Sequence, residues 1–111
     1  MKTTVKTRFT TIAEVAKQQA QGSKPYLEFL RVPAVSAGLY VLAAGTADQQ
    51  SPHHEDEMYY VVRGKAHFRA GDEDREVSAG SILFVAAEVE HRFYDITEEL
   101  GVLVFFAPAE T

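Results

Sequence analysis

The sequence predicts an all-β barrel or sandwich preceded by one short helix. After Pro25 the chain consists of short runs rich in Val, Tyr, Phe, Leu and Ile, the residue types enriched in strands. Turn residues separate eight such runs of even spacing between residues 26 and 107, as in antiparallel barrels and sandwiches. No linker or repeat divides the chain, so we expect one domain over residues 1–111, with the barrel at about 26–107.

The helical segment is expected at residues 11–22. Thr11-Ile-Ala-Glu14 reads as a capping box, and Gly22 follows the last helical position. Its apolar positions, Ile12, Val15 and Ala16, make one narrow stripe. A helix with so little apolar surface is expected to pack on the outside of the barrel.

Turn signals set the limits of the strands. Arg63-Gly64-Lys65 predicts a tight hairpin, residues 70–74 a charged hairpin tip, and residues 79–81 another turn. The predicted strands are residues 26–32, 38–44, 58–62, 66–70, 75–78, 82–86, 91–96 and 100–107.

Composition excludes several classes of protein. A net charge of −5 argues against a nucleic-acid binder, which would show a basic patch. No apolar run approaches the roughly 20 residues that span a bilayer, and the N-terminal stretch does not resemble a secretory signal. The absence of cysteine excludes disulfides and thiolate metal sites. We therefore expect a cytoplasmic protein with no membrane or nucleic-acid partner.

A dense polar cluster precedes the apolar run at residues 58–62. Residues 53–57 hold two histidines and three acids, which suits a divalent metal. Because strand side chains alternate, Glu57, Tyr59 and Val61 share one face, His53 has the same parity, and His54 does not. A further ligand would have to come from elsewhere, from His67 or His91. The alternative is an exposed charge cluster at a loop end, and Glu55 and Asp56 are expected to be exposed in either case.

Two stretches resemble the paired motifs of the cupin superfamily. The first motif, G-x5-H-x-H-x(3,4)-E-x6-G, is matched in spacing by Gly45, Ser51, His53, Glu57 and Gly64. The second, G-x5-P-x-G-x2-H-x3-N, is matched in spacing by Gly80, Ala86, Glu88, His91 and Asp95. Neither match needs a gap, and the resemblance covers about residues 26–107. It implies a double-stranded β-helix, or jelly-roll barrel.

The resemblance implies three metal ligands, His53, Glu57 and His91. The first motif histidine is replaced by Ser51, and such a two-histidine, one-carboxylate set leaves coordination positions open. Fe, Mn, Ni, Co and Zn all suit it and are not distinguished by the sequence. We expect Ser51 to lie near the metal without bonding to it.

Other candidates are weaker. Gln49 has the parity of Ser51 and would be a weak oxygen ligand. His54 is expected at the surface or behind a ligand, with replacement of the missing ligand as the less favoured alternative, and His67 is expected at the surface. The core is expected to include Tyr59, Phe84, Phe93 and Phe105. Tyr59 is also a weak catalytic candidate, and Tyr40 could line the mouth of the pocket.

The resemblance supports two principal functions. One is a metal-dependent enzyme that acts on a small organic molecule, with dioxygenase-, isomerase- or lyase-like chemistry. The other is a non-catalytic module for small-ligand binding or sensing. A less favoured third is a barrel without metal. A cavity with a polar group facing the metal would favour the enzyme, and one closed by Phe and Leu would favour the binder. We expect a homodimer, because open barrels leave strand edges that proteins cover.

Overall fold

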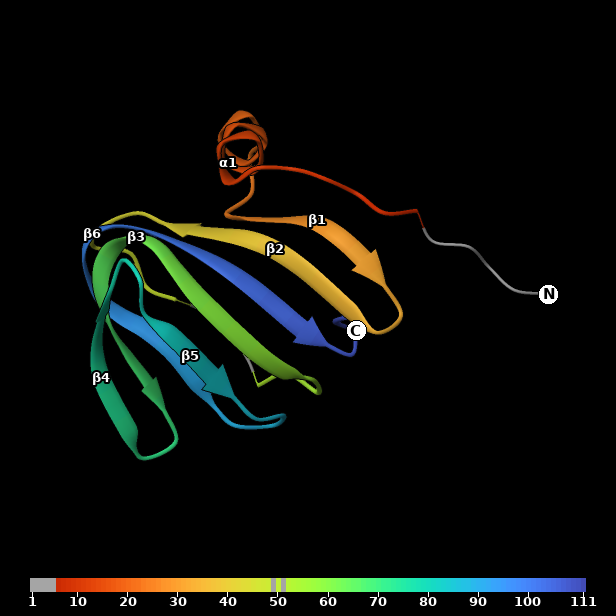
Figure 1. Cartoon of the computed structure of the whole chain (residues 1–111). Coiled ribbons are helices and arrows are strands. Elements are labelled where there is room, and N and C mark those ends of the chain that lie inside the picture. The colour runs from red at the N-terminus through yellow and green to blue at the C-terminus, as the bar shows by residue number, and fades with distance from the viewer. Residues whose placement is uncertain (1–5, 49, 51) are drawn as a thin grey trace.

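The computed structural model describes residues 6–48, 50 and 52–111, and it confirms the all-β class with one short helix (Figure 1). Every strand pairing is antiparallel, and the sheet order is β1-β2-β6-β3-β4, with β5 paired to β3. No helix in the described part of the chain has the length and apolar character needed to cross a membrane. The elements are α1 (Ile12–Gln21), β1 (Tyr26–Val32), β2 (Val35–Leu42), β3 (Asp56–Ala70), β4 (Glu73–Ser78), β5 (Ile82–Val85) and β6 (His91–Ala107).

The helix α1 begins and ends close to where the sequence predicts. The Thr11 side chain accepts a hydrogen bond from the Glu14 backbone N–H at 3.1 Å, which caps the first turn. Only Val15 of this helix is buried, and Ile12 remains 41% exposed. Figure 1 shows α1 over the outside of β1, as its narrow apolar stripe predicts.

The eight predicted strands are six in the structure, because β3 and β6 are each continuous. The predicted hairpin at Arg63-Gly64-Lys65 is wrong, since β3 passes through it. Gly64 has a φ of +96°, and the register of β3 against β6 is irregular between Val61 and His67. The glycine therefore forms a bulge that bends the strand, where the sequence had suggested a reversal.

Gly64→Ala is expected to lower the melting temperature markedly. A Cβ there would collide with the Glu99 carbonyl oxygen and lie 2.7 Å from the Leu100 Cα, and neither backbone atom can swing away. Positive φ alone costs a non-glycine residue about 1–3 kcal/mol. Gly80→Ala is the matched control for thermal melting, because Gly80 has a φ of +95° with nothing within 4 Å of its added Cβ. Equal losses in both variants would contradict the role of the close contact.

Two other motif positions have a positive φ. Glu88 stands where the motif has glycine and has a φ of 68°, and Asp95 stands where it has asparagine and has a φ of 50°. Aspartate tolerates this left-handed region, whereas glutamate there costs roughly 1–2 kcal/mol. Both positions thus have the backbone conformation that glycine and asparagine, the residues of the motif, adopt most readily.

Alternation along β3 sorts its side chains between core and surface. Glu57, Tyr59 and Val61 are buried, whereas Met58 and Tyr60 are 46% and 42% exposed. Phe93, on β6, is buried as expected. The same alternation overturns the expectation that Phe84 and Phe105 belong to the core. Both pair with Met58 in register, so they share its outward face and are 63% and 38% exposed.

Candidate metal centre

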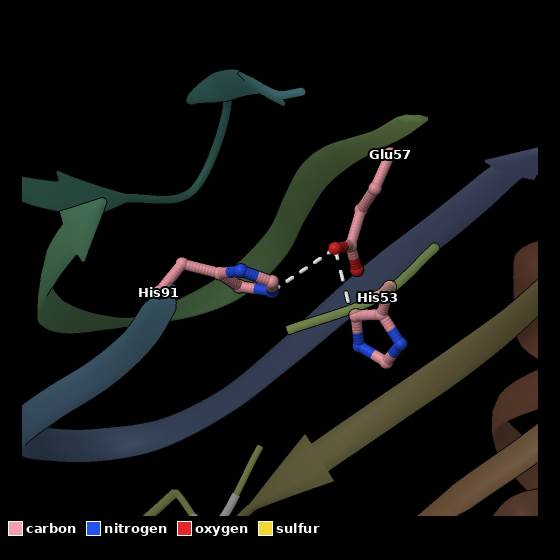
Figure 2. Close-up of side chains that lie close together, drawn as sticks. All are labelled: His53, Glu57 and His91. Atoms are coloured by element: carbon pink, nitrogen blue, oxygen red, sulfur yellow. Dashed lines mark ion pairs between the residues drawn. The ribbon is translucent and has the colours of Figure 1, made fainter. Parts of the chain in front are cut away.

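Three side chains singled out in the sequence meet inside the barrel. Figure 2 shows the imidazoles of His53 and His91 around the carboxylate of Glu57. Glu57 Oε1 lies 3.0 Å from His91 Nε2 and 4.0 Å from His53 Nε2, and one ligand atom from each residue falls within 4.8 Å of the others. Glu57 and His91 are buried, and His53 is partly exposed. The cluster could hold one metal ion.

The bend in the β3–β6 ladder brings these residues together. Glu57 pairs with Phe106 at one end of the ladder, and His91 pairs with Ala70 at the other. The 13 steps from 57 to 70 would span about 43 Å in a straight strand at about 3.3 Å per residue. The starts of β3 and β6 are therefore not paired with each other in the ladder. They face each other because the bent ladder closes on itself.

His53 reaches the cluster from the loop before β3. Its carbonyl oxygen accepts a hydrogen bond from the Glu88 N–H at 2.7 Å, and its ring packs edge-on against Phe106 with centroids 4.9 Å apart. The loop is thus tied to the turn that leads into His91. The two motif segments hold each other in place.

The donor atoms at the cluster fit a divalent cation. Both carboxylate oxygens of Glu57 and Nε2 of His91 are buried without a hydrogen-bond partner in the described part of the chain. His91 Nδ1 lies 2.8 Å from the Val89 carbonyl oxygen, to which it donates in the neutral tautomer, so its Nε2 lone pair faces Glu57. Buried acceptors that face one another are unfavourable unless a proton or a metal lies between them. Nitrogen and oxygen donors of this kind suit first-row divalent ions.

The pKa of His91 decides how a metal would compete with protons. Burial opposes protonation of His91, but the Glu57 carboxylate, which accepts a hydrogen bond from Nε2 once the ring is protonated, and the Val89 carbonyl outweigh it, so the pKa of His91 is raised above the ordinary 6.5. Protonation of His91 therefore stabilises the metal-free fold fully below about pH 6.5, and this contribution is lost as pH rises through the raised pKa.

Metal affinity is expected to fall as pH is lowered through the raised pKa of His91, because binding must then displace the His91 proton. One competing proton gives a loss of up to about tenfold per pH unit, which isothermal titration at several pH values would measure. His54→Ala is the control, since His54 also has a raised pKa, through its hydrogen bond to Glu88, but lies outside the cluster. An affinity that does not change with pH would contradict this account.

A cavity of about 280 Å³ opens beside His53. Three of its lining residues, Gln50, His53 and Glu110, are polar or charged. The other four are Tyr26, Tyr40, Val104 and Phe106. Burial, followed by the charge of Glu110, raises the pKa of Tyr26 far above its ordinary value. A molecule in this cavity would therefore touch one member of the cluster and meet both polar and aromatic surface.

No pattern in the sequence points to the polar network behind His53. The buried Asp48 accepts hydrogen bonds from the Tyr40 hydroxyl at 2.8 Å, the Gln50 amide at 2.7 Å and the Phe93 N–H at 2.9 Å. Gln50 Oε1 in turn lies 3.3 Å from His53 Nε2. Asp48 and Gln50 occupy unspecified positions of the first motif, so only the structure links them to the site.

Tyr59 belongs to this network rather than to the cavity wall. Its hydroxyl donates to Gln50 Oε1 at 3.0 Å, and its side chain is 1% exposed. Burial, followed by the charge of Glu57, raises its pKa well above 10. A catalytic role for Tyr59 stays a prediction, whereas Tyr40 does line the cavity as expected.

Several other sequence candidates lie elsewhere. Ser51 and Gln49 fall outside the described residues. His54 is exposed, and its Nδ1 lies 2.8 Å from Glu88 Oε2, away from the cluster. His67 lies at the surface near Glu76, as expected. Glu55, expected to be exposed, is buried at 4% exposure, because the Thr111 hydroxyl packs on it and donates to its carboxylate at 2.9 Å.

Comparison with known proteins identifies the family. A family model described as a cupin domain matches residues 38–107. The chain belongs to the cupin family. This cupin is 46% identical over 98 residues to an uncharacterized protein of Streptomyces coelicolor, an alignment that covers 88% of this chain and 93% of the relative.

Solved structures agree on the fold of this cupin. One is an RmlC-like cupin family protein with a double-stranded β-helix fold from Methanocaldococcus jannaschii, with 18% identity, a TM-score of 0.66, and coverage of 78% of this chain and 83% of the other. Another is the DMSP lyase DddQ from Ruegeria pomeroyi, with 21% identity, a TM-score of 0.64 and coverage of 68% of this chain. The chain spans only 39% of that lyase. The double-stranded β-helix implied by the motifs is confirmed.

Proposed function

We propose that this cupin is a metal-dependent enzyme that acts on a small organic molecule, with His53, Glu57 and His91 as its metal ligands. The observation that carries the proposal is the position of His53, which belongs both to the cluster of unpartnered donor atoms and to the wall of the cavity. A molecule in the cavity therefore lies beside the ligand set.

The character of the cavity favours an enzyme over a passive binder. Its wall includes an acid, Glu110, and an amide, Gln50, beside His53, where a structural metal would be sealed by Phe and Leu. A bound divalent ion would supply Lewis-acid polarisation of a substrate oxygen. Lyase or isomerase chemistry needs no redox metal, whereas dioxygenase chemistry does. The similarity in fold to a lyase is compatible with the first of these classes.

Non-catalytic ligand binding is the second candidate. At about 280 Å³ the cavity is near the lower end of the roughly 300–1,000 Å³ typical of small-molecule sites. Four of its seven lining residues are Tyr26, Tyr40, Val104 and Phe106. A module of this kind would bind its ligand and release it unchanged.

Elemental analysis of protein purified without added metal tests the first part of the proposal. We expect one divalent ion per chain in the wild type and much less in Glu57→Gln. A thermal-shift screen of small organic molecules, followed by product detection for each hit, then separates the candidates. Metal-free wild-type protein that takes up no added divalent ion would overturn the metal site, and tight hits without turnover would favour the binder.

We also propose that the protein forms a homodimer and works in the cytoplasm. The outer face of three paired strands exposes Ile82 and Phe84 of β5, Met58 and Tyr60 of β3, and Phe105 of β6. Apolar patches of this kind often mark interfaces, and a twofold axis could pair the patch with its own copy. Light scattering should give a dimer mass for the wild type and a monomer mass for Phe84→Lys. A wild-type monomer at all concentrations would rule the dimer out. The cytoplasmic location is tested separately, by cell fractionation.

A further inference from the structure

The segment after β6 places an acid beside the candidate metal centre. The Glu110 N–H donates to the Ser36 hydroxyl at 2.9 Å, and the Glu110 carbonyl oxygen accepts from Arg31 Nη2 at 2.7 Å. On either side of it, the Ala109 N–H donates to the Pro33 carbonyl oxygen at 3.2 Å and the Thr111 hydroxyl donates to Glu55. The backbone of Glu110 is thus fixed at both polar atoms, and its carboxylate lies on the cavity wall.

The imidazole of His53 lies between a carboxylate oxygen and an amide oxygen, which differ in how strongly they accept a hydrogen bond. Its Nδ1 is 3.4 Å from Glu110 Oε2, and its Nε2 is 3.3 Å from the amide oxygen of Gln50. Nε2 is also the nitrogen nearer to Glu57, at 4.0 Å, so it is the atom that would bind a metal shared with Glu57 and His91.

A neutral imidazole carries one proton, and its position decides whether His53 can be a ligand. A proton on Nε2 would be donated to Gln50 and would occupy the lone pair that the metal needs. A proton on Nδ1 faces Glu110 and leaves Nε2 free. A carboxylate is a stronger acceptor than an amide, and Gln50 Oε1 already accepts from the Tyr59 hydroxyl.

We propose that Glu110 is a positioning residue for His53: its carboxylate holds the histidine proton on Nδ1 and so keeps Nε2 available for the metal. The inference rests on the proposed metal site. At His91 the Val89 carbonyl oxygen forms a hydrogen bond with Nδ1 at 2.8 Å, a closer contact than the 3.4 Å ion-pair distance between His53 Nδ1 and Glu110 Oε2. Each histidine therefore has an oxygen atom near Nδ1, and its Nε2 is the nitrogen nearer to Glu57. Acceptors behind metal-bound histidines commonly fix the tautomer in this way.

The test compares wild type with Glu110→Ala and Glu110→Gln in two measurements. Nitrogen-15 NMR of the histidine side chains in metal-free protein at alkaline pH reports which nitrogen of His53 carries the proton. We expect Nδ1–H in the wild type and Nε2–H in Glu110→Ala. Titration with zinc should show a loss of about 10–100-fold in affinity for Glu110→Ala. Glu110→Gln keeps an oxygen acceptor and should recover part of both properties.

Glu88→Ala is the matched control, because it removes a carboxylate from Nδ1 of the exposed His54, 2.8 Å away, and should change neither measurement for His53. An unchanged His53 tautomer in Glu110→Ala would overturn the proposal, as would equal zinc affinity in all variants. If the wild type binds no zinc, the proposed metal site fails. The NMR comparison still decides whether Glu110 sets the tautomer.

Discussion

Replacing His91 with alanine is expected to remove most metal binding from the protein. His91 Nε2 lies 3.0 Å from Glu57 Oε1, and the His91 side chain is 1% exposed, so the substitution removes a buried donor from the cluster and alanine offers none in its place. Loss of a partner behind a ligand commonly costs about 10–100-fold in affinity, and loss of the ligand itself should cost more, at least about 100-fold. Titration with zinc or cobalt would measure this.

The control for His91→Ala is His67→Ala, which removes a histidine that lies at the surface beside Glu76 and outside the cluster. Its metal affinity should match the wild type. Circular dichroism should show that both variants keep their strand content. A folded His91→Ala variant with wild-type affinity would mean that the metal, if any, binds elsewhere.

Because Ser51 is predicted to lie near the metal without bonding to it, Ser51→Ala should lose far less metal affinity than His91→Ala in the same titration.

Removing the metal with a chelator is expected to lower the melting temperature by about 10 °C. A ligand present at 100 times its dissociation constant stabilises the folded state by about 2.7 kcal/mol, and each kcal/mol corresponds to about 4 °C in a domain of this size. The physical reason is that both carboxylate oxygens of Glu57 and Nε2 of His91 are buried with no hydrogen-bond partner among the described residues, and they would face one another without a cation between them. Thermal unfolding with and without chelator measures the shift.

Glu57→Gln separates this effect from general effects of the chelator. The variant replaces a buried carboxylate with a neutral amide of nearly equal shape, so it should lose metal and melt at one temperature with or without chelator. Without metal, the variant is expected to be at least as stable as the wild type, since it no longer buries a carboxylate whose oxygens have no hydrogen-bond partner among the described residues. A wild type that melts at the same temperature in both conditions would contradict metal binding to the folded state.

The sequence determined the class of fold and the members of the cluster. The signals for both are local. They are the residue types that favour strands, the turn residues at regular intervals and the two motifs of fixed spacing, and none of them depends on the tertiary structure. The parity of Glu57 with Tyr59 and Val61 is also local, because alternation is a property of a single strand. The capping of α1 by Thr11 follows from the same kind of local rule.

Only the tertiary structure decided what these segments meet. At Gly64 a glycine between polar residues is compatible with a hairpin or a bulge, and the pairing of β3 with β6 on both sides of it selects the bulge. Phe84 and Phe105 have the composition of core residues, but their register against Met58 turns them outward. Glu110 lies 57 residues from His53 in the sequence, from 53 to 110, and no pattern links them. Such contacts depend on how distant segments pack, and local preference does not encode them.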